Sequence, residues 1–455
     1  MNLSQNENQN EGEGPRNAVV LVVDGLSAAM LGAYGNTWFE TANSNRLAAR
    51  SLLFDYAFSS STNLEHSYQR FWMPAQPSGS DSSGSKNLIE TIANSGASTN
   101  LLTDEAQVGE SSLASSFDHV TQIAPAHANK IADSVAETEL ANFFARATSW
   151  LFDLEPGSLA WIHSRGLTGA WDAPHQMRAS LMGEGDPVPG DFYQPPSGMF
   201  DLEQDDPDDL LAFQQACAAQ VMMLDQFLGV LLDLMESDPV WRSALICFTS
   251  PRGYALGEHG VLGHGNELPS NYNESVHVPL MVSVPDTPQH HQLRDFQSVR
   301  NGSLRQTDLI GDCLLDWFTN DLFADRFRSL AFEIPKPQNQ AVVIDSQKGS
   351  IDSQKGRIHS EKGSIVSDGM ARSTMSIQTQ AWKLIKKTGE HDLQNSHQVE
   401  LYAKPDDRWE VNDVSRRCPH IVEALTQVLD DHIKAGGLGR QGCLDLEESL
   451  WHRAK

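Results

Sequence analysis

Two charged residues that directly follow apolar segments are the first candidates for chemistry in this sequence. Asp24 follows the run NAVVLVV, and Pro251 and Arg252 follow the run ALICFTS. In α/β proteins, functional groups sit just past the carboxyl ends of the sheet strands. We favour a helix-capping role for Asp24, because aspartate is a good cap where a helix follows a strand. Arg252 could bind an anion, but we favour an ion pair in which Asp24 is the partner.

Other familiar catalytic patterns are missing from the sequence. No Gly-x-Ser-x-Gly stretch occurs, and no glycine-rich phosphate loop follows a strand. The stretch GEHG contains Glu258 and His259, and we expect it to serve turn geometry rather than catalysis. A serine-hydrolase or nucleotide site is therefore not predicted.

The elements that must position these residues alternate along the first part of the chain. Unbroken apolar runs predict buried strands, and 3.6-residue periodicity predicts helices. The expected strands are 17–24, 97–103, 158–164, 244–250 and 278–285, and the expected helices are 41–54, 87–96, 137–154 and 208–237. Residues 165–207, rich in Gly, Pro and acid, are expected to form a long excursion. Strands separated by helices predict an α/β fold with a mostly parallel sheet flanked by helices.

The sequence changes character after about residue 335. Antiparallel strands are expected within 375–387 and 398–404, and a helix over 419–437, which predicts a small C-terminal α+β subdomain. The expected organisation is a disordered tail over 1–16, an N-terminal α/β domain over 17–335 and a C-terminal subdomain over 336–455.

A seven-residue unit repeats three times within the C-terminal part, as IDSQKGS, IDSQKGR and IHSEKGS over 344–364. Each unit has one aliphatic residue, which is too little to bury, and a coiled coil would need two apolar positions per heptad. We predict a mobile low-complexity insertion whose deletion costs little stability. A functional tether is the alternative.

Four ordered blocks of the sequence resemble the sulfatase family of the alkaline phosphatase superfamily. The blocks are VVLVVD with LGAYGN and TANSNRLAARSLLF, then FTSPRGYALGEHGVLGHGN with ESVHVPLMVSVP, then SIQTQAWKLIKK, and then VELYAKPDD. They run in the family order from about residue 17 to 435. The resemblance implies the alkaline-phosphatase/sulfatase-like fold, with the mostly parallel sheet and the smaller C-terminal subdomain.

The resemblance also implies a Ca²⁺ or Mg²⁺ site, but most of its ligands are replaced here. The family has a second aspartate where this chain has Gly25, and Asp-His or Asp-Asn where it has Pro251 and Arg252. Only Asp24 remains, as a vestigial metal ligand if it is not a cap. Because hard cations need several oxygen ligands, and a guanidinium would repel them, no metal cofactor is expected.

The family's catalytic side chains are replaced as well. The residue that becomes formylglycine corresponds to Leu64, followed by Glu65, His66 and Ser67, and the supporting arginine corresponds to Tyr68. A register slip could bring Ser61 or Thr62 to the nucleophile position, but without a metal these hydroxyls would be poorly activated. At further family positions the chain has Asp104 for Lys, Ala106 for His, Gly166–Thr168 for Asp-Pro-His, and His264 for Lys.

Composition limits the partners and the compartment. The 455-residue chain has a formal net charge of −27 and no basic stripe, so neither nucleic acid nor an anionic membrane surface is an expected partner. The five cysteines are few and far apart, which predicts buried or incidental thiols. The N-terminus lacks the pattern of a secretory signal, and no apolar run reaches the ~18 residues of a membrane span, so a cytoplasmic location is expected.

Taken with the lost residues, the resemblance implies a sulfatase-like protein that is catalytically inactive or severely impaired. Its expected role is binding, scaffolding or regulation, with a small anion or a protein as partner. One alternative is an active sulfuric-ester or phosphoric-ester hydrolase that uses Thr62 or Ser61 with Asp24 and His264. Another is an interaction protein that uses its acidic surface and the repeat.

Overall fold

The computed structural model describes most of the chain. The described residues are 15–73, 87–125, 128–201, 203–264, 270–285, 295–319, 323–332, 340–347, 373–388, 399–434 and 443–445. Most of the tail predicted over 1–16 lies outside this set. Its last residue, Arg16, is fixed, because its Nη1 donates to the carbonyl of Trp317 at 2.7 Å.

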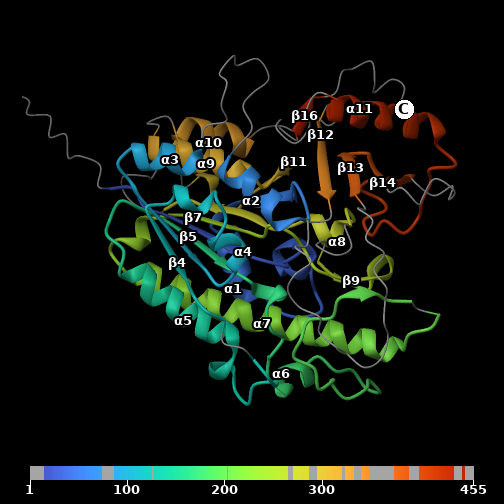
Figure 1. The fold of residues 1–455 in the computed structure, drawn as a ribbon, viewed down its shortest axis with the longest axis horizontal. Helices are drawn as coiled ribbons and strands as arrows, with labels where there is room; N and C mark the ends of the chain where they lie inside the picture. Colours follow the sequence, from blue (N-terminus) through green and yellow to red (C-terminus); the bar gives the residue numbers. More distant parts are fainter. Residues whose placement is uncertain are drawn as a thin grey trace, which may run out of the picture.

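An eight-stranded sheet forms the centre of the larger domain (Figure 1). Its order is β11 (Val299–Gln306), β2 (Ser51–Phe58), β10 (Leu280–Ser283), β7 (Leu245–Thr249), β1 (Ala18–Val23), β5 (Ser158–Ser164), β3 (Ser98–Thr103) and β4 (His119–Gln122). Only β10 runs antiparallel to its neighbours, β2 and β7. The predicted mostly parallel sheet is confirmed, and all five strands expected from apolar runs are present.

The two faces of the sheet explain why its strands are apolar throughout. Along β1, Val19, Leu21 and Val23 belong to one buried cluster, whereas Val20 and Val22 belong to the other. Side chains alternate across a strand, so a strand covered on both faces needs apolar residues at every position.

Helices cover both faces of this sheet (Figure 1). One face packs against α1 (Ala42–Ala48), α5 (Glu139–Phe152) and α7 (Pro207–Ser237), and the other against α2 (Leu64–Trp72), α3 (Leu88–Asn94), α9 (Leu309–Thr319) and α10 (Phe323–Phe332). By length and composition α7 could cross a membrane, but 67% of its most apolar window is buried inside the fold. Burial in the core accounts for the apolar character of α7.

The helix predicted over 41–54 is wrong in its second half. The helix α1 ends at Ala48, and β2 begins at Ser51. Leu53 packs on one face of the sheet, while Leu52 and Phe54 pack on the other. Three consecutive apolar residues suit a strand buried on both faces, because a helix with one buried face would leave some of them in water.

The C-terminal subdomain is a second sheet with one long helix, as predicted. Five antiparallel strands run in the order β15 (Val399–Ala403), β14 (Trp382–Thr388), β13 (Ser373–Thr379), β12 (Gln340–Gln347) and β16 (Cys443–Asp445). The helix α11 (Pro419–Lys434) packs on this sheet through Ile421, Leu425 and Leu429. The boundary predicted between residues 335 and 336 lies outside the described residues.

The repeat predicted to be a mobile insertion begins inside β12. Ile344 is fully buried with Phe58, Val276 and Leu304 of the larger domain. The hydroxyl of Ser346 accepts a hydrogen bond from the amide of Thr62 at 3.0 Å. The prediction of a mobile insertion is therefore wrong for residues 344–347, because Ile344, the aliphatic residue of the first unit, is buried against the larger domain. Residues 348–364 lie outside the described set.

Candidate functional site

Asp24 and Arg252 form a buried ion pair at the carboxyl edge of the main sheet. β1 and β7 are adjacent and parallel, and their last paired residues are Val22 and Thr249. Arg252 Nε donates to Asp24 Oδ1 at 2.9 Å, and Arg252 Nη2 donates to Asp24 Oδ2 at 2.8 Å. Neither side chain is more than 3% exposed. The ion pair predicted from the sequence is confirmed.

The helix-capping role predicted for Asp24 is wrong. The next helical turn begins at Ala28, with Ser27 as its N-cap residue. Gly25 adopts a φ of +82°, which turns the chain away before that turn starts. The Asp24 carboxylate instead accepts a third hydrogen bond, from Thr168 Oγ1 at 3.3 Å.

Charge and burial act in opposite directions on Asp24. Burial favours the neutral acid, but the charge and hydrogen bonds of Arg252 outweigh burial and lower the pKa of Asp24. The aspartate is therefore ionised at neutral pH, and Arg252 neutralises its charge.

The residues around Asp24 do not fit a Ca²⁺ or Mg²⁺ ion. Both carboxylate oxygens accept hydrogen bonds from the guanidinium, and Pro251 has no donor side chain. An aspartate could not replace Gly25 without strain, because a Cβ there would lie 3.0 Å from Leu167 Cβ at a positive φ. Within the described part of the chain, no group of three or more His, Cys, Asp or Glu is placed to hold a metal ion.

The stretch that corresponds to the family nucleophile forms the start of helix α2. Asn63 caps this helix by accepting from the amide of His66 at 3.1 Å. Leu64, the first helical residue, is 1% exposed and packs in the core. Ser67 Oγ lies 3.2 Å from the carbonyl oxygen of Pro251, so its hydroxyl ties α2 to the loop after β7.

Neither candidate hydroxyl nucleophile is open to solvent. Ser61 is 2% exposed, and its Oγ accepts from the amide of Asn63 at 3.1 Å. Thr62 is 1% exposed, and its Oγ1 is buried with no hydrogen-bond partner in the described residues. The carbonyl of Thr62 accepts from Arg252 Nη1 at 3.2 Å. An ester in water would reach neither hydroxyl in this arrangement.

Sequence reasoning missed His163, which lies beside the ion pair. His163 is fully buried in β5, and its Nδ1 lies 2.5 Å from the hydroxyl of Tyr68. Burial lowers the pKa of His163 to about 4 and raises the pKa of Tyr68, so both are neutral at pH 7. The only signal in the sequence was a single histidine within the apolar run SLAWIHS.

His264 and Asp104 correspond to two further positions at which the resemblance implied lysines. Burial, and after it the charge of the nearby Arg252, lowers the pKa of His264 to about 4, so this imidazole is neutral at pH 7. Asp104 accepts from the amide of Arg165 at 2.7 Å, and burial raises the pKa of Asp104 to about 7. A cationic centre able to stabilise a leaving group is therefore not assembled by these two residues.

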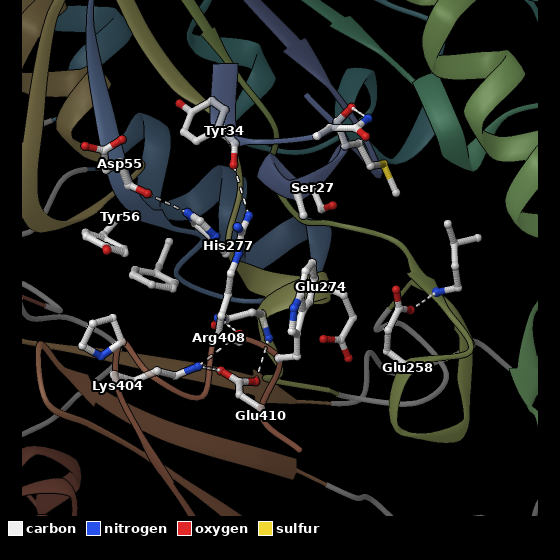
Figure 2. Close-up of a pocket in the computed structure, with 18 of the residues that line it drawn as sticks. Ser27, Tyr34, Asp55, Tyr56, Glu258, Glu274, His277, Lys404, Arg408 and Glu410 are labelled. Atoms are coloured by element: carbon white, nitrogen blue, oxygen red, sulfur yellow. Dashed lines mark hydrogen bonds and ion pairs between the residues drawn. The ribbon is translucent and has the colours of Figure 1, made fainter. Parts of the chain in front are cut away.

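A large cavity lies beside this site, between the main sheet and the C-terminal subdomain (Figure 2). It has a volume of about 1440 Å³, and aromatic and charged residues line it. None of Asp24, Thr62, Leu64, Arg252 and His264 lines it. The cavity is thus distinct from the edge of the sheet where the family chemistry would take place.

The GEHG turn lines this cavity and contacts both the larger domain and the C-terminal subdomain. Gly257, His259 and Gly260 all have positive φ, which agrees with the predicted role in turn geometry. The two ring nitrogens of His259 lie 3.1 Å from Glu274 Oε1 and 2.9 Å from the carbonyl oxygen of Glu410. Burial opposes protonation, but the Glu274 carboxylate outweighs it and raises the pKa of His259.

The chain is similar to known sulfatases in sequence over part of its length and in fold over most of it. A family model described as Sulfatase matches residues 170–319. Human iduronate 2-sulfatase is 39% identical over 72 residues, which is 16% of this chain and only 12% of the length of that relative. A solved 2-O GAG sulfatase has a TM-score of 0.63 at 16% identity, over 96% of each chain. The phosphonate monoester hydrolase of Agrobacterium radiobacter has a TM-score of 0.60 at 15% identity, over 93% of this chain and 96% of its own.

The chain therefore has the fold of these solved sulfatase and phosphonate monoester hydrolase structures. In sequence, residues 170–319 are similar to the sulfatase family.

Proposed function

We propose that this protein has lost the sulfatase reaction and acts by binding. The observation that carries the proposal is the bidentate pair between Arg252 and Asp24, which occupies the remaining carboxylate of the family metal site. Sulfate-ester hydrolysis in this family relies on a divalent cation to neutralise the ester oxygens and to activate the nucleophile. A guanidinium held on both carboxylate oxygens supplies local neutrality but has no open coordination position for a substrate or a hydroxyl.

The buried nucleophile stretch supports the same proposal. Leu64 has no group that attacks an ester, and it fills the core together with the aromatic side chains of α2. Tyr68, which is hydrogen-bonded to the neutral His163, and the neutral His264 stand where the resemblance implies an arginine and a lysine. A site with these neutral groups lacks the positive charge that would stabilise a charged transition state.

Turnover of aryl esters tests the proposal. Purified protein would be incubated with 4-nitrophenyl sulfate and 4-nitrophenyl phosphate, in EDTA and in excess Ca²⁺ or Mg²⁺. We expect no release of nitrophenol above the rate without protein under any of these conditions. Metal-dependent turnover that is abolished in Thr62→Val would refute the proposal and would support a hydroxyl nucleophile at that position.

A further inference from the structure

The cavity between the domains has walls that suit a small organic molecule. Its lining includes aromatic side chains that remain open to solvent, among them Trp38 (48% exposed), Tyr56 (39%) and Trp409 (60%). Cavities that are mostly apolar with a few convergent polar groups are the usual form of ligand sites. The chemical nature of the ligand then depends on which charges in the lining still lack a counterion.

The cations of the lining already have partners within the protein. Arg300 donates to Asp55, and Lys404 Nζ lies 2.8 Å from Glu410 Oε1. Arg408 donates to the carbonyl of Tyr34 at 3.1 Å, and its guanidinium lies over the ring of Trp409. Arg300 and Lys404 are thus paired with carboxylates, whereas no carboxylate of the described residues pairs with Arg408. Lys404 and Arg408 lie on one side of the cavity in Figure 2.

Two carboxylates, Glu258 and Glu274, also line the cavity. In Figure 2, Glu258 lies apart from Lys404 and Arg408, and Glu274 lies between Arg408 and Glu258. Glu258 Oε2 accepts from the amide of Leu256 at 2.6 Å, and no cationic side chain of the described residues pairs with it. Among the described residues, the Glu274 carboxylate forms one ion pair, with His259. Glu258 is solvent-exposed, as expected for a residue that faces an open cavity.

The two carboxylates are close enough to influence each other. Burial, and after it the negative charge of Glu274, raises the pKa of Glu258. Like charges that face one space favour a cation between them, because the cation removes the repulsion as well as forming its own hydrogen bonds. Aromatic faces add to this preference through cation–π contacts with an ammonium group.

We propose that the interdomain cavity binds an organic cation, with its ammonium group between Glu258 and Glu274 and its apolar body against the aromatic lining. This ligand class is opposite in charge to a sulfate ester. The inference does not depend on the proposed loss of catalysis, because none of its residues belongs to the Asp24–Arg252 site.

Three small probes of similar size but different charge test this site: benzyltrimethylammonium, benzyl alcohol and phenyl sulfate. Binding to the full chain would be measured by isothermal titration calorimetry and by saturation-transfer NMR. We expect saturable binding of the cation, at least about tenfold tighter than that of the neutral or anionic probe. Higher salt should weaken it, because the attraction is electrostatic.

Variants assign the binding to the two carboxylates. Glu258→Gln keeps an acceptor for the Leu256 amide and removes only the charge, so it should weaken binding of the cation about tenfold. Glu274→Gln should act in the same direction. Glu423→Gln, which makes the same charge change on the exposed surface of α11, should leave the affinity unchanged. Tighter binding of phenyl sulfate, equal binding to Glu258→Gln and the wild type, or no saturable binding of any probe would overturn the proposal.

Discussion

Arg252 lies in the loop after the neighbouring strand β7 and donates to both carboxylate oxygens of Asp24, at 2.9 and 2.8 Å, where neither side chain is open to water. The arrangement is bidentate and largely desolvated, so neither charge tolerates loss of the other. Most of the expected behaviour of this site follows from that relationship.

The pair should show strong energetic coupling. Arg252→Met leaves a buried carboxylate and Asp24→Asn leaves a buried guanidinium, so each change should cost about 3–5 kcal/mol of unfolding free energy. The double variant should cost much less than the sum of the two. Urea denaturation of all four proteins measures this cycle, and additive effects would show that the two residues are not coupled.

A second buried charge cluster should hold the C-terminal subdomain on the larger domain. Lys383 in β14 is fully buried, and its Nζ lies 2.9 Å from Glu410 Oε1 and donates to Asn273 at 2.9 Å. Lys404 also pairs with Glu410, at 2.8 Å, so the carboxylate keeps one cation when Lys383 is lost. Lys383→Met should therefore lower the unfolding free energy by about 2 kcal/mol.

The same strand offers a control for this prediction. Lys386 pairs with Asp430 at 2.7 Å, but both side chains are partly exposed. Lys386→Met should cost less than about 1 kcal/mol in the same urea titration. Equal losses of unfolding free energy in the two variants would mean that the buried Lys383–Glu410 pair is no more stabilising than an exposed one.

Asp104 should make stability depend on pH. Burial raises its pKa to about 7 from an ordinary value of 3.8, so the folded state binds the proton more tightly than the unfolded state does. Its contribution is then present below about pH 4 and is lost as pH rises towards 7. Asp104→Asn should accordingly stabilise the protein at pH 8, by roughly 1–3 kcal/mol, with the gain shrinking towards pH 5. Denaturation at several pH values measures this gain, and a variant less stable than the wild type at pH 8 would contradict the assignment.

The first unit of the repeat should contribute to the core. Ile344 is fully buried between the two domains, so Ile344→Ala should cost about 2–4 kcal/mol. Ile433, which is 41% exposed in α11, provides the control, and Ile433→Ala should change stability by no more than about 0.5 kcal/mol. The thermal unfolding midpoints of the two variants would be compared. Similar midpoints would show that burial of Ile344 contributes no stability.

The fold could be predicted where the sequence pattern is compatible with only one type of secondary structure. Val19 to Val23 form an unbroken apolar run, and only a strand covered on both faces accounts for it. Leu52 to Phe54 could also fit a helix, because the preceding segment has helical spacing, and tertiary burial on two faces decided for the strand. Ile344 is a similar case, since nothing local in the repeat shows that a neighbouring domain buries it.

The candidate site was predicted in part. The replacement of metal ligands by Gly25, Pro251 and Arg252 could be inferred from the positions that match the family motif. The pairing of Arg252 with Asp24 could also be predicted, because both residues follow strands of the sheet. His163 was not found, because a lone histidine inside a strand gives no sign of its partner 95 positions away in the chain. The cavity and its carboxylates, Glu258 and Glu274, were also beyond reach, because the walls come from segments that only the folded chain brings together.

The metal content of the purified protein tests the central claim most directly. Tag-free protein would be dialysed against buffer without chelator and analysed for Ca, Mg, Mn and Zn against protein concentration. Because the Asp24 carboxylate is held by Arg252, we expect far less than one equivalent of any divalent metal per chain. About one equivalent of Ca²⁺ or Mg²⁺ that persists through dialysis, and that is lost in Asp24→Asn, would contradict the account.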